Sequence, residues 1–152
     1  MKPILLFLFV IVLYVAVGLS CSTSGGGKRI NTDSNGLAAH GYDAVAFFAD
    51  NAAVRGNPTY EYAWNSAKWV FATAANLEQF KQDPEAFAPQ FGGYCAYSAS
   101  QGKIVEGNPE HYKVVDGKLY FCNNAEAAKA WAKGDDELLK KAEKFWAENQ
   151  AK

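Results

Sequence analysis

The strongest local constraint in the chain is an Asp-Gly pair between two runs of residues that favour strands. Asp116 and Gly117 separate Tyr-Lys-Val-Val at 112–115 from Lys-Leu-Tyr-Phe at 118–121. Asp-Gly in this setting is typical of a two-residue turn, in which both central residues need a positive φ. The sequence therefore predicts a tight antiparallel hairpin. The pairs expected to face each other are Val115 with Lys118, Lys113 with Tyr120, and His111 with Cys122.

Other segments carry helix and strand signals. Residues 44–48 form an apolar run that favours a short buried strand, and 60–64 and 68–71 are aromatic-rich strand candidates. Three helices are expected, over 74–81 behind Thr73, from Asn123 or Asn124 to Trp131, and over 135–148. The predicted class is α+β, with a small antiparallel sheet of hairpins packed against about three helices.

The size and charge of the chain limit its function. The 152 residues are 49% hydrophobic and carry a formal charge of −1, which indicates one globular domain and argues against a nucleic-acid partner. A weak internal repeat at an offset of 50 relates Lys68–Ala72 to Lys118–Cys122, each placed before an expected helix. A duplication and a repeated use of the same local physics both explain it.

The first twenty residues have the pattern of a signal peptide. A basic start leads into 4–19, sixteen residues without a charge, which is short for a bilayer span. Cys21 and a Gly/Ser-rich stretch follow, and together they resemble the processing site of a bacterial lipoprotein. The resemblance implies a signal peptide over 1–20, a lipid on Cys21, a tether over 21–36 and a domain over 37–150. The alternative is an uncleaved anchor with an incidental cysteine.

Export to the bacterial cell envelope, with the lipid holding the chain to a membrane, follows from that assignment. It would place Cys95 and Cys122 in a compartment that permits disulfides.

Four motifs in the expected domain resemble the YHS domain family, in its exported single-domain branch. They are His-Gly-Tyr-Asp-Ala-Val-Ala-Phe at 40–47, Phe-Lys-Gln-Asp-Pro-Glu-Ala-Phe-Ala-Pro-Gln at 80–90, Phe-Gly-Gly-Tyr-Cys-Ala-Tyr at 91–97, and Val-Val-Asp-Gly-Lys-Leu-Tyr at 114–120. The resemblance implies a small metal-binding module of the kind associated with copper and other heavy metals. Metal-binding members have Phe-Cys at a strand end and a second Cys four residues later. This chain has Phe71-Ala72 and Asn76 there, so that site does not carry over.

A metal site can also be inferred from position. If His111 faces Cys122 across the hairpin, an imidazole and a thiol lie together as ligands for copper or zinc, with Cys95 or His40 as a third. Cys122 also precedes a helix start, which favours the thiolate. Two alternatives remain open, a structural Cys95–Cys122 disulfide and a pair of inert buried thiols.

Catalysis is not expected. A Cys nucleophile with a His base lacks a recognisable orienting group, and Asp43, Glu106 and Glu110 are interpreted as solvated acids. The aromatic residues at 60–69 are interpreted as core rather than as a ligand groove. The sequence thus predicts a non-enzymatic, lipid-anchored YHS-like module that binds a transition metal such as copper. The rival is a structural or protein-interaction domain with a disulfide and no metal.

Overall fold

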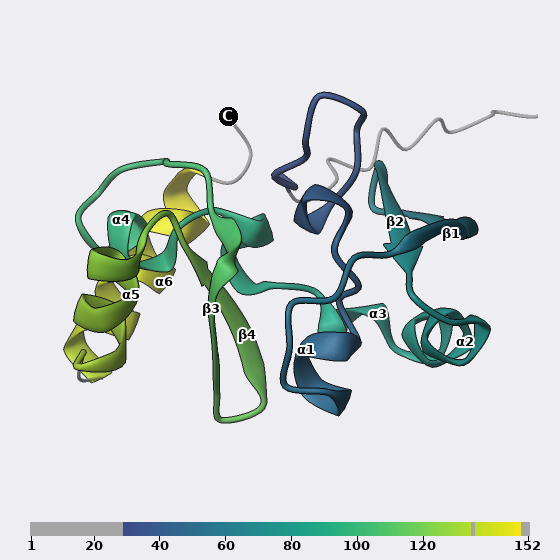
Figure 1. Ribbon diagram of the computed structural model, residues 1–152. Coiled ribbons are helices and arrows are strands. Elements are labelled where there is room, and N and C mark those ends of the chain that lie inside the picture. The colour runs from purple at the N-terminus through teal and green to yellow at the C-terminus, as the bar shows by residue number, and fades with distance from the viewer. Residues whose placement is uncertain (1–28, 135, 150–152) are drawn as a thin grey trace, which may run out of the picture.

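Two antiparallel hairpins organise the fold. The computed structural model describes residues 29–134 and 136–149. Strand β1 (Asn57–Trp64) pairs with β2 (Ala67–Phe71), and β3 (Asn108–Val115) pairs with β4 (Lys118–Cys122), as two separate two-stranded sheets. Helices pack around each hairpin (Figure 1). The predicted α+β class with antiparallel hairpins is confirmed.

The three expected longer helices are present. They are α2 (Ala74–Gln82), α5 (Ala125–Ala132) and α6 (Asp136–Asn149). The side chain of Thr73 accepts a hydrogen bond from Asn76 N at 3.1 Å at the start of α2, and that of Asn124 accepts one from Ala127 N at 2.8 Å at the start of α5. These caps fix where both helices begin because they satisfy amide groups that lack a partner within the helix.

Shorter helical elements occupy the loops. They are η1 (Ala39–Gly41), α1 (Ala46–Ala49), α3 (Pro84–Phe87), η2 (Gln90–Gly93) and α4 (Ala96–Ser100). The strand predicted over 44–48 is wrong, because α1 lies there. The carboxylate of Asp43 accepts hydrogen bonds from Val45 N at 2.9 Å and Ala46 N at 3.3 Å, and so favours a helical turn. A five-residue apolar run does not by itself distinguish a buried strand from a buried helix.

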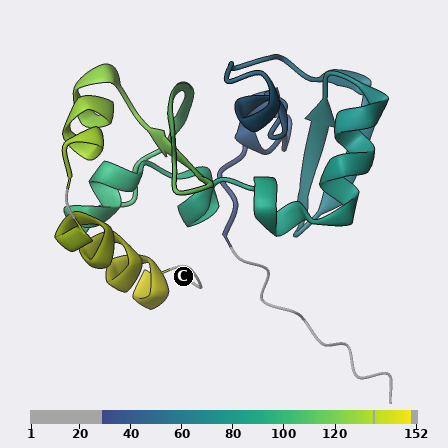
Figure 2. The ribbon, with the colours of Figure 1, turned by 90° about the horizontal axis from the view of Figure 1, so that it is seen from below.

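The fold repeats one unit, a hairpin followed by a helix (Figure 2). In the first hairpin Asn57 pairs with Phe71, the register then shifts, and Glu61 pairs with Val70. In the second, Asn108 pairs with Cys122 and Tyr112 with Phe121, with the shift at the same place. Phe71 therefore corresponds to Cys122, which makes the repeat one residue longer than the sequence spacing of 50 suggested.

A glycine precedes each hairpin at the same position. A Cβ on Gly56 would lie 2.5 Å from Val70 O, and a Cβ on Gly107 would lie 2.7 Å from Phe121 Cβ. Val70 and Phe121 are themselves equivalent in the two hairpins. Both units thus need a residue without a side chain where the incoming chain crosses the second strand.

Strand β4 lies between two hydrophobic clusters. Leu119 and Phe121 belong to the first cluster, around Phe47, Trp69 and Phe80. The residues that alternate with them, Tyr120 and Cys122, belong to the second cluster with α4, α5 and α6. Burial on both faces explains why this strand is an almost unbroken apolar run.

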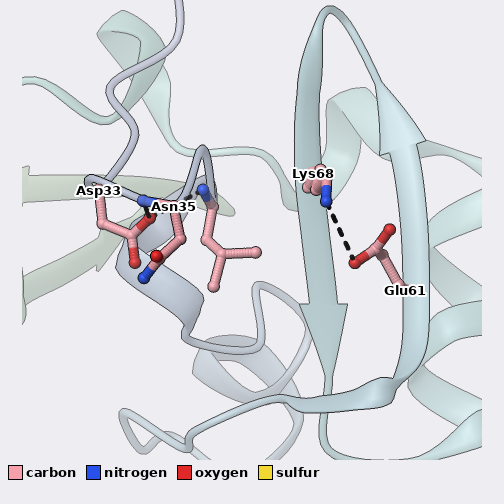
Figure 3. Close-up of polar contacts among 5 residues, drawn as sticks. Asp33, Asn35, Glu61 and Lys68 are labelled. Atoms are coloured by element: carbon pink, nitrogen blue, oxygen red, sulfur yellow. Dashed lines mark hydrogen bonds and ion pairs between the residues drawn. The ribbon is translucent and has the colours of Figure 1, made fainter.

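The described chain packs against the domain from its first residues. Asn31 is 4% exposed, and its amide N–H donates to Gly92 O at 2.8 Å. Asp33 Oδ1 accepts hydrogen bonds from the amides of Asn35 at 2.8 Å and Leu37 at 2.9 Å (Figure 3). Packed structure therefore begins before residue 37, where the sequence placed the domain boundary. Figure 3 also shows the Lys68–Glu61 ion pair, 4.0 Å across the first hairpin.

Candidate functional site

The fold brings Cys95 and Cys122 into contact. Cys95 immediately precedes α4, Cys122 ends β4, and both residues are 0% exposed. A parallel bridge between Cys95 and Phe121 holds the two segments side by side. Both cysteines are free thiols, and their side chains are joined by a hydrogen bond.

The two sulfurs have opposite electrostatic environments. The hydrogen bond from Cys122 lowers the pKa of the Cys95 thiol to about 5 in spite of burial, and bonds from Ser98 and from the Asn123 backbone act in the same direction. The same contact, together with burial, raises the pKa of Cys122. The contact therefore favours the thiolate on Cys95 and the proton on Cys122.

Cys95 Sγ accepts one hydrogen bond from its own loop, and as a neutral thiol it donates one to Asn123, the residue after β4. Ser98 N donates to it at 3.4 Å. Asn123 Oδ1 lies 3.6 Å from the same sulfur. Since a thiolate cannot donate to that oxygen, ionised Cys95 favours the rotated amide, in which Nδ2 faces the sulfur.

The predicted pairing of His111 with Cys122 is wrong. The ladder follows the expected register from the turn as far as Tyr112 and Phe121, after which it shifts and Asn108 faces Cys122. Pro109 has no amide hydrogen for the ladder, and Asn108 Oδ1 accepts from Glu110 N at 2.9 Å. At these local features β3 advances by more residues than β4, so that Asn108 rather than His111 faces Cys122. His111 lies instead in a surface pocket beside Lys113 and α5.

His40 lies apart from the thiols, at the wall of another pocket. Its backbone is left-handed, with φ 49° and ψ 35°, and its Nε2 is buried without a hydrogen-bond partner. The pocket is also lined by Tyr42, Arg55, Glu110 and Asn123. Asn123 thus borders both this pocket and the sulfur of Cys95.

Of the four candidate ligands, only the two cysteines meet. Within residues 29–134 and 136–149, no three His, Cys, Asp or Glu side chains are grouped so that they could hold a metal ion. Zn²⁺ in structural sites takes four ligands, whereas Cu(I) is soft and prefers thiolates. The chemistry available to the pair is soft-metal binding or thiol oxidation.

Asp43 was interpreted as a solvated acid, and this interpretation is wrong because Asp43 is 0% exposed. Glu106 and Glu110 are exposed, as expected. A signal for Asp43 does exist in the sequence, since Gly41-Tyr42-Asp43-Ala44 parallels Gly93-Tyr94-Cys95-Ala96. That match places Asp43 and Cys95 at equivalent positions of the two segments.

The signal peptide over 1–20 and the lipid site at Cys21 lie outside the described residues. Among the helices of the described part, none has the length and apolar character needed to span a membrane.

Comparisons of the chain with models of known protein families, with curated proteins and with solved structures found no match.

Proposed function

We propose that the chain is an exported YHS-type module, held to a membrane by a lipid on Cys21, that binds a Cu(I)-type ion and catalyses no reaction. The observation that carries the proposal is the contact between two fully buried thiols, of which one is stabilised as a thiolate. The lipoprotein-like start and the four YHS-like motifs support the assignment of export and module type.

The type and number of ligands favour Cu(I) between these sulfurs. Thiolates are soft ligands that suit a soft ion, and the pair supplies two of them. Zn²⁺ in structural sites takes four ligands, and among the described residues no further His, Cys, Asp or Glu joins the pair. Copper is therefore preferred over zinc for this pair.

An anaerobic competition titration against a chromogenic Cu(I) chelator tests the proposal. The full chain is used in detergent, with Cys21→Ser in every sample so that only the pair contributes thiols. We expect one ion per chain. Cys95→Ser and Cys122→Ser should each weaken binding more than the roughly 10- to 100-fold typical of an outer-shell change.

His111→Ala and His40→Ala are the matched controls, and both should bind as the parent does. Equal binding by the cysteine variants would contradict the proposal. The rival function, a structural or protein-interaction domain with a Cys95–Cys122 disulfide, predicts no copper uptake and a large fall in melting temperature on reduction.

A further inference from the structure

A cavity of about 240 Å³ opens between the two hairpin units, and neither cysteine of the described chain lines it. Its wall is supplied by the turn after β1, by α3 and the loop that follows it, by η2 and by α6. The first of these segments belongs to the first unit and the last to the second. Ligand pockets commonly lie where two parts of a fold meet in this way.

Three aromatic side chains line the cavity from different elements, Trp64 in β1, Phe91 in η2 and Trp146 in α6. The rings of Trp146 and Phe91 lie 6.1 Å apart, and a Cβ on Gly92 would lie 3.3 Å from Trp146 Cζ2. Trp64 is held by the buried ring of Trp69 at 5.7 Å. Indole faces carry negative potential, and tryptophan is the best aromatic partner for a cation. These walls therefore favour a cationic ligand over an anionic one.

Two carboxylates add negative charge to the same cavity. Glu85 lines it from α3 and Glu143 from α6, and both residues are exposed. Within the part of the chain that the structure describes, no Lys, Arg or His lines this cavity. A cleft lined by one sign of charge attracts ligands of the opposite sign. The aromatic walls and the carboxylates thus select the same class of ligand by two different interactions.

The neighbouring aromatic surface already holds a cation. The guanidinium of Arg29 lies 5.2 Å from the centre of the Tyr94 ring, and its Nε donates to the Tyr94 hydroxyl at 3.2 Å. The Tyr94 ring packs in turn 5.7 Å from that of Trp146. A cation is thus stable beside this aromatic cluster, and Arg29 itself does not line the cavity.

We infer that the cavity binds a small organic cation with a quaternary ammonium group, such as choline. A quaternary ammonium has no N–H donors, so it loses less hydration on leaving water than a primary ammonium does. It needs aromatic faces and nearby negative charge, and Trp64, Trp146 and Glu143 supply both. The cavity is smaller than the roughly 300–1,000 Å³ of sites for drug-sized ligands, so its occupant is a compact molecule. Neither cysteine takes part, so this site is independent of copper binding.

Isothermal titration calorimetry tests the site. The full Cys21→Ser chain, metal-free and in an uncharged maltoside detergent, is titrated with choline chloride at constant chloride concentration, with a detergent blank. Two comparison ligands are ethanolamine, a primary ammonium, and the neutral isostere of choline in which a tert-butyl group replaces the trimethylammonium group. We expect saturable choline binding with a dissociation constant of about 1 mM or lower. The isostere and ethanolamine should each bind at least about tenfold more weakly, because the first lacks charge and the second is strongly hydrated.

Glu143→Gln removes a carboxylate from the cavity at nearly constant side-chain size and should weaken choline binding about two- to fivefold. Glu148→Gln is the matched control, because Glu148 is exposed on the same helix but does not line the cavity. It makes the same change in net charge and should bind choline as the parent does. Trp64→Leu keeps an apolar side chain but removes an indole face, and should weaken the binding of choline more than that of the isostere.

Equal affinity for choline and its isostere, or choline binding weaker than about 10 mM, would overturn the inference. Equal affinity for choline and ethanolamine would also overturn it, since the carboxylates alone would then explain binding. An equal loss in Glu143→Gln and Glu148→Gln would reveal attraction to net charge rather than a site. If circular dichroism shows that Trp64→Leu does not fold, the glutamate pair and the isostere still decide. The copper titration uses none of these ligands, so each of the two proposals can fail without the other.

Discussion

At the level of single residues, Cys95 and Asp43 illustrate how position determines chemistry. Both side chains are 0% exposed, and both face backbone amides that two separate segments supply. Burying an unpaired carboxylate or thiolate costs free energy, and hydrogen bonds from backbone amides offset that cost. The exchange of a carboxylate for a thiol therefore places an ionisable sulfur where the first unit has a structural anion.

The stability of the reduced protein should depend on pH through this pair. In the unfolded chain both thiols titrate near about pH 8.5, whereas folded Cys95 is ionised above about 5. Between these values the unfolded chain binds more protons, so stability should rise with pH and be lost as pH falls toward 5. The slope is at most about 1.4 kcal/mol per pH unit for one proton. Above about pH 8.5 the raised pKa of Cys122 reverses the trend.

Urea unfolding of the metal-free Cys21→Ser chain at pH values across this window measures the effect. In Cys95→Ser the free energy of unfolding should increase less with pH. If the increase is unchanged in that variant, groups other than Cys95 cause it.

At the level of elements, local chemistry predicts starts and turns better than it predicts register. Asp116-Gly117 predicted the second hairpin, and Thr73 and Asn124 predicted two helix starts, because these signals act within a few residues. The position of His111 depended on a register shift that one-residue alternation along β3 does not reveal. Helix α1 depended on Asp43, which is itself bound to Ala72 across the fold.

The two hairpin turns offer a direct comparison. Asn65 and Ser66 have φ of 51° and 61°, and Asp116 and Gly117 have φ of 50° and 70°. Serine in the left-handed region is strained by roughly 1–2 kcal/mol, whereas glycine is not. Ser66→Gly should therefore stabilise the protein by up to about 1 kcal/mol, and Gly117→Ser should destabilise it by a similar amount. Chemical denaturation measures both, and the same sign for both changes would contradict the equivalence of the turns.

At the level of the whole molecule, the two units share strand β4. The ring of Phe121 lies 5.4 Å from that of Phe47, and Tyr42 donates to Glu110 at 2.7 Å between the units. Tyr120, the next residue along β4, packs at 5.2 Å from Trp131 in the other cluster. Composition predicted one domain. The sharing of a strand between two cores was not predictable, because it depends on which residues of an apolar run face which helices.

Because residues of β4 are buried in both hydrophobic clusters, we expect the two units to unfold together. Phe121→Ala removes a side chain that is 1% exposed and should cost about 3–5 kcal/mol. Hydrogen exchange should show amides of β2 and of α5 losing protection together in this variant. Loss confined to the second unit would contradict a single cooperative domain.

The candidate site was partly predictable. The sequence named Cys95 and Cys122 both as ligands and as a disulfide pair, and the fold places them in contact. The role of Asp43 was missed although Gly41-Tyr42-Asp43-Ala44 parallels Gly93-Tyr94-Cys95-Ala96. The role of Asn123 depends on a contact across the fold that local sequence does not show. His111 was grouped with the thiols by a register that β3 does not keep.

Copper binding by the thiol pair is best tested by metal analysis and a free-thiol count on the same sample. The full Cys21→Ser chain is purified anaerobically from copper-supplemented cells, without reductant or chelator. We expect one copper ion per chain, and two thiols that react only after a chelator removes the metal. A chain with no copper and no free thiols, whose melting temperature falls sharply on reduction, would contradict it and identify a disulfide-stabilised scaffold.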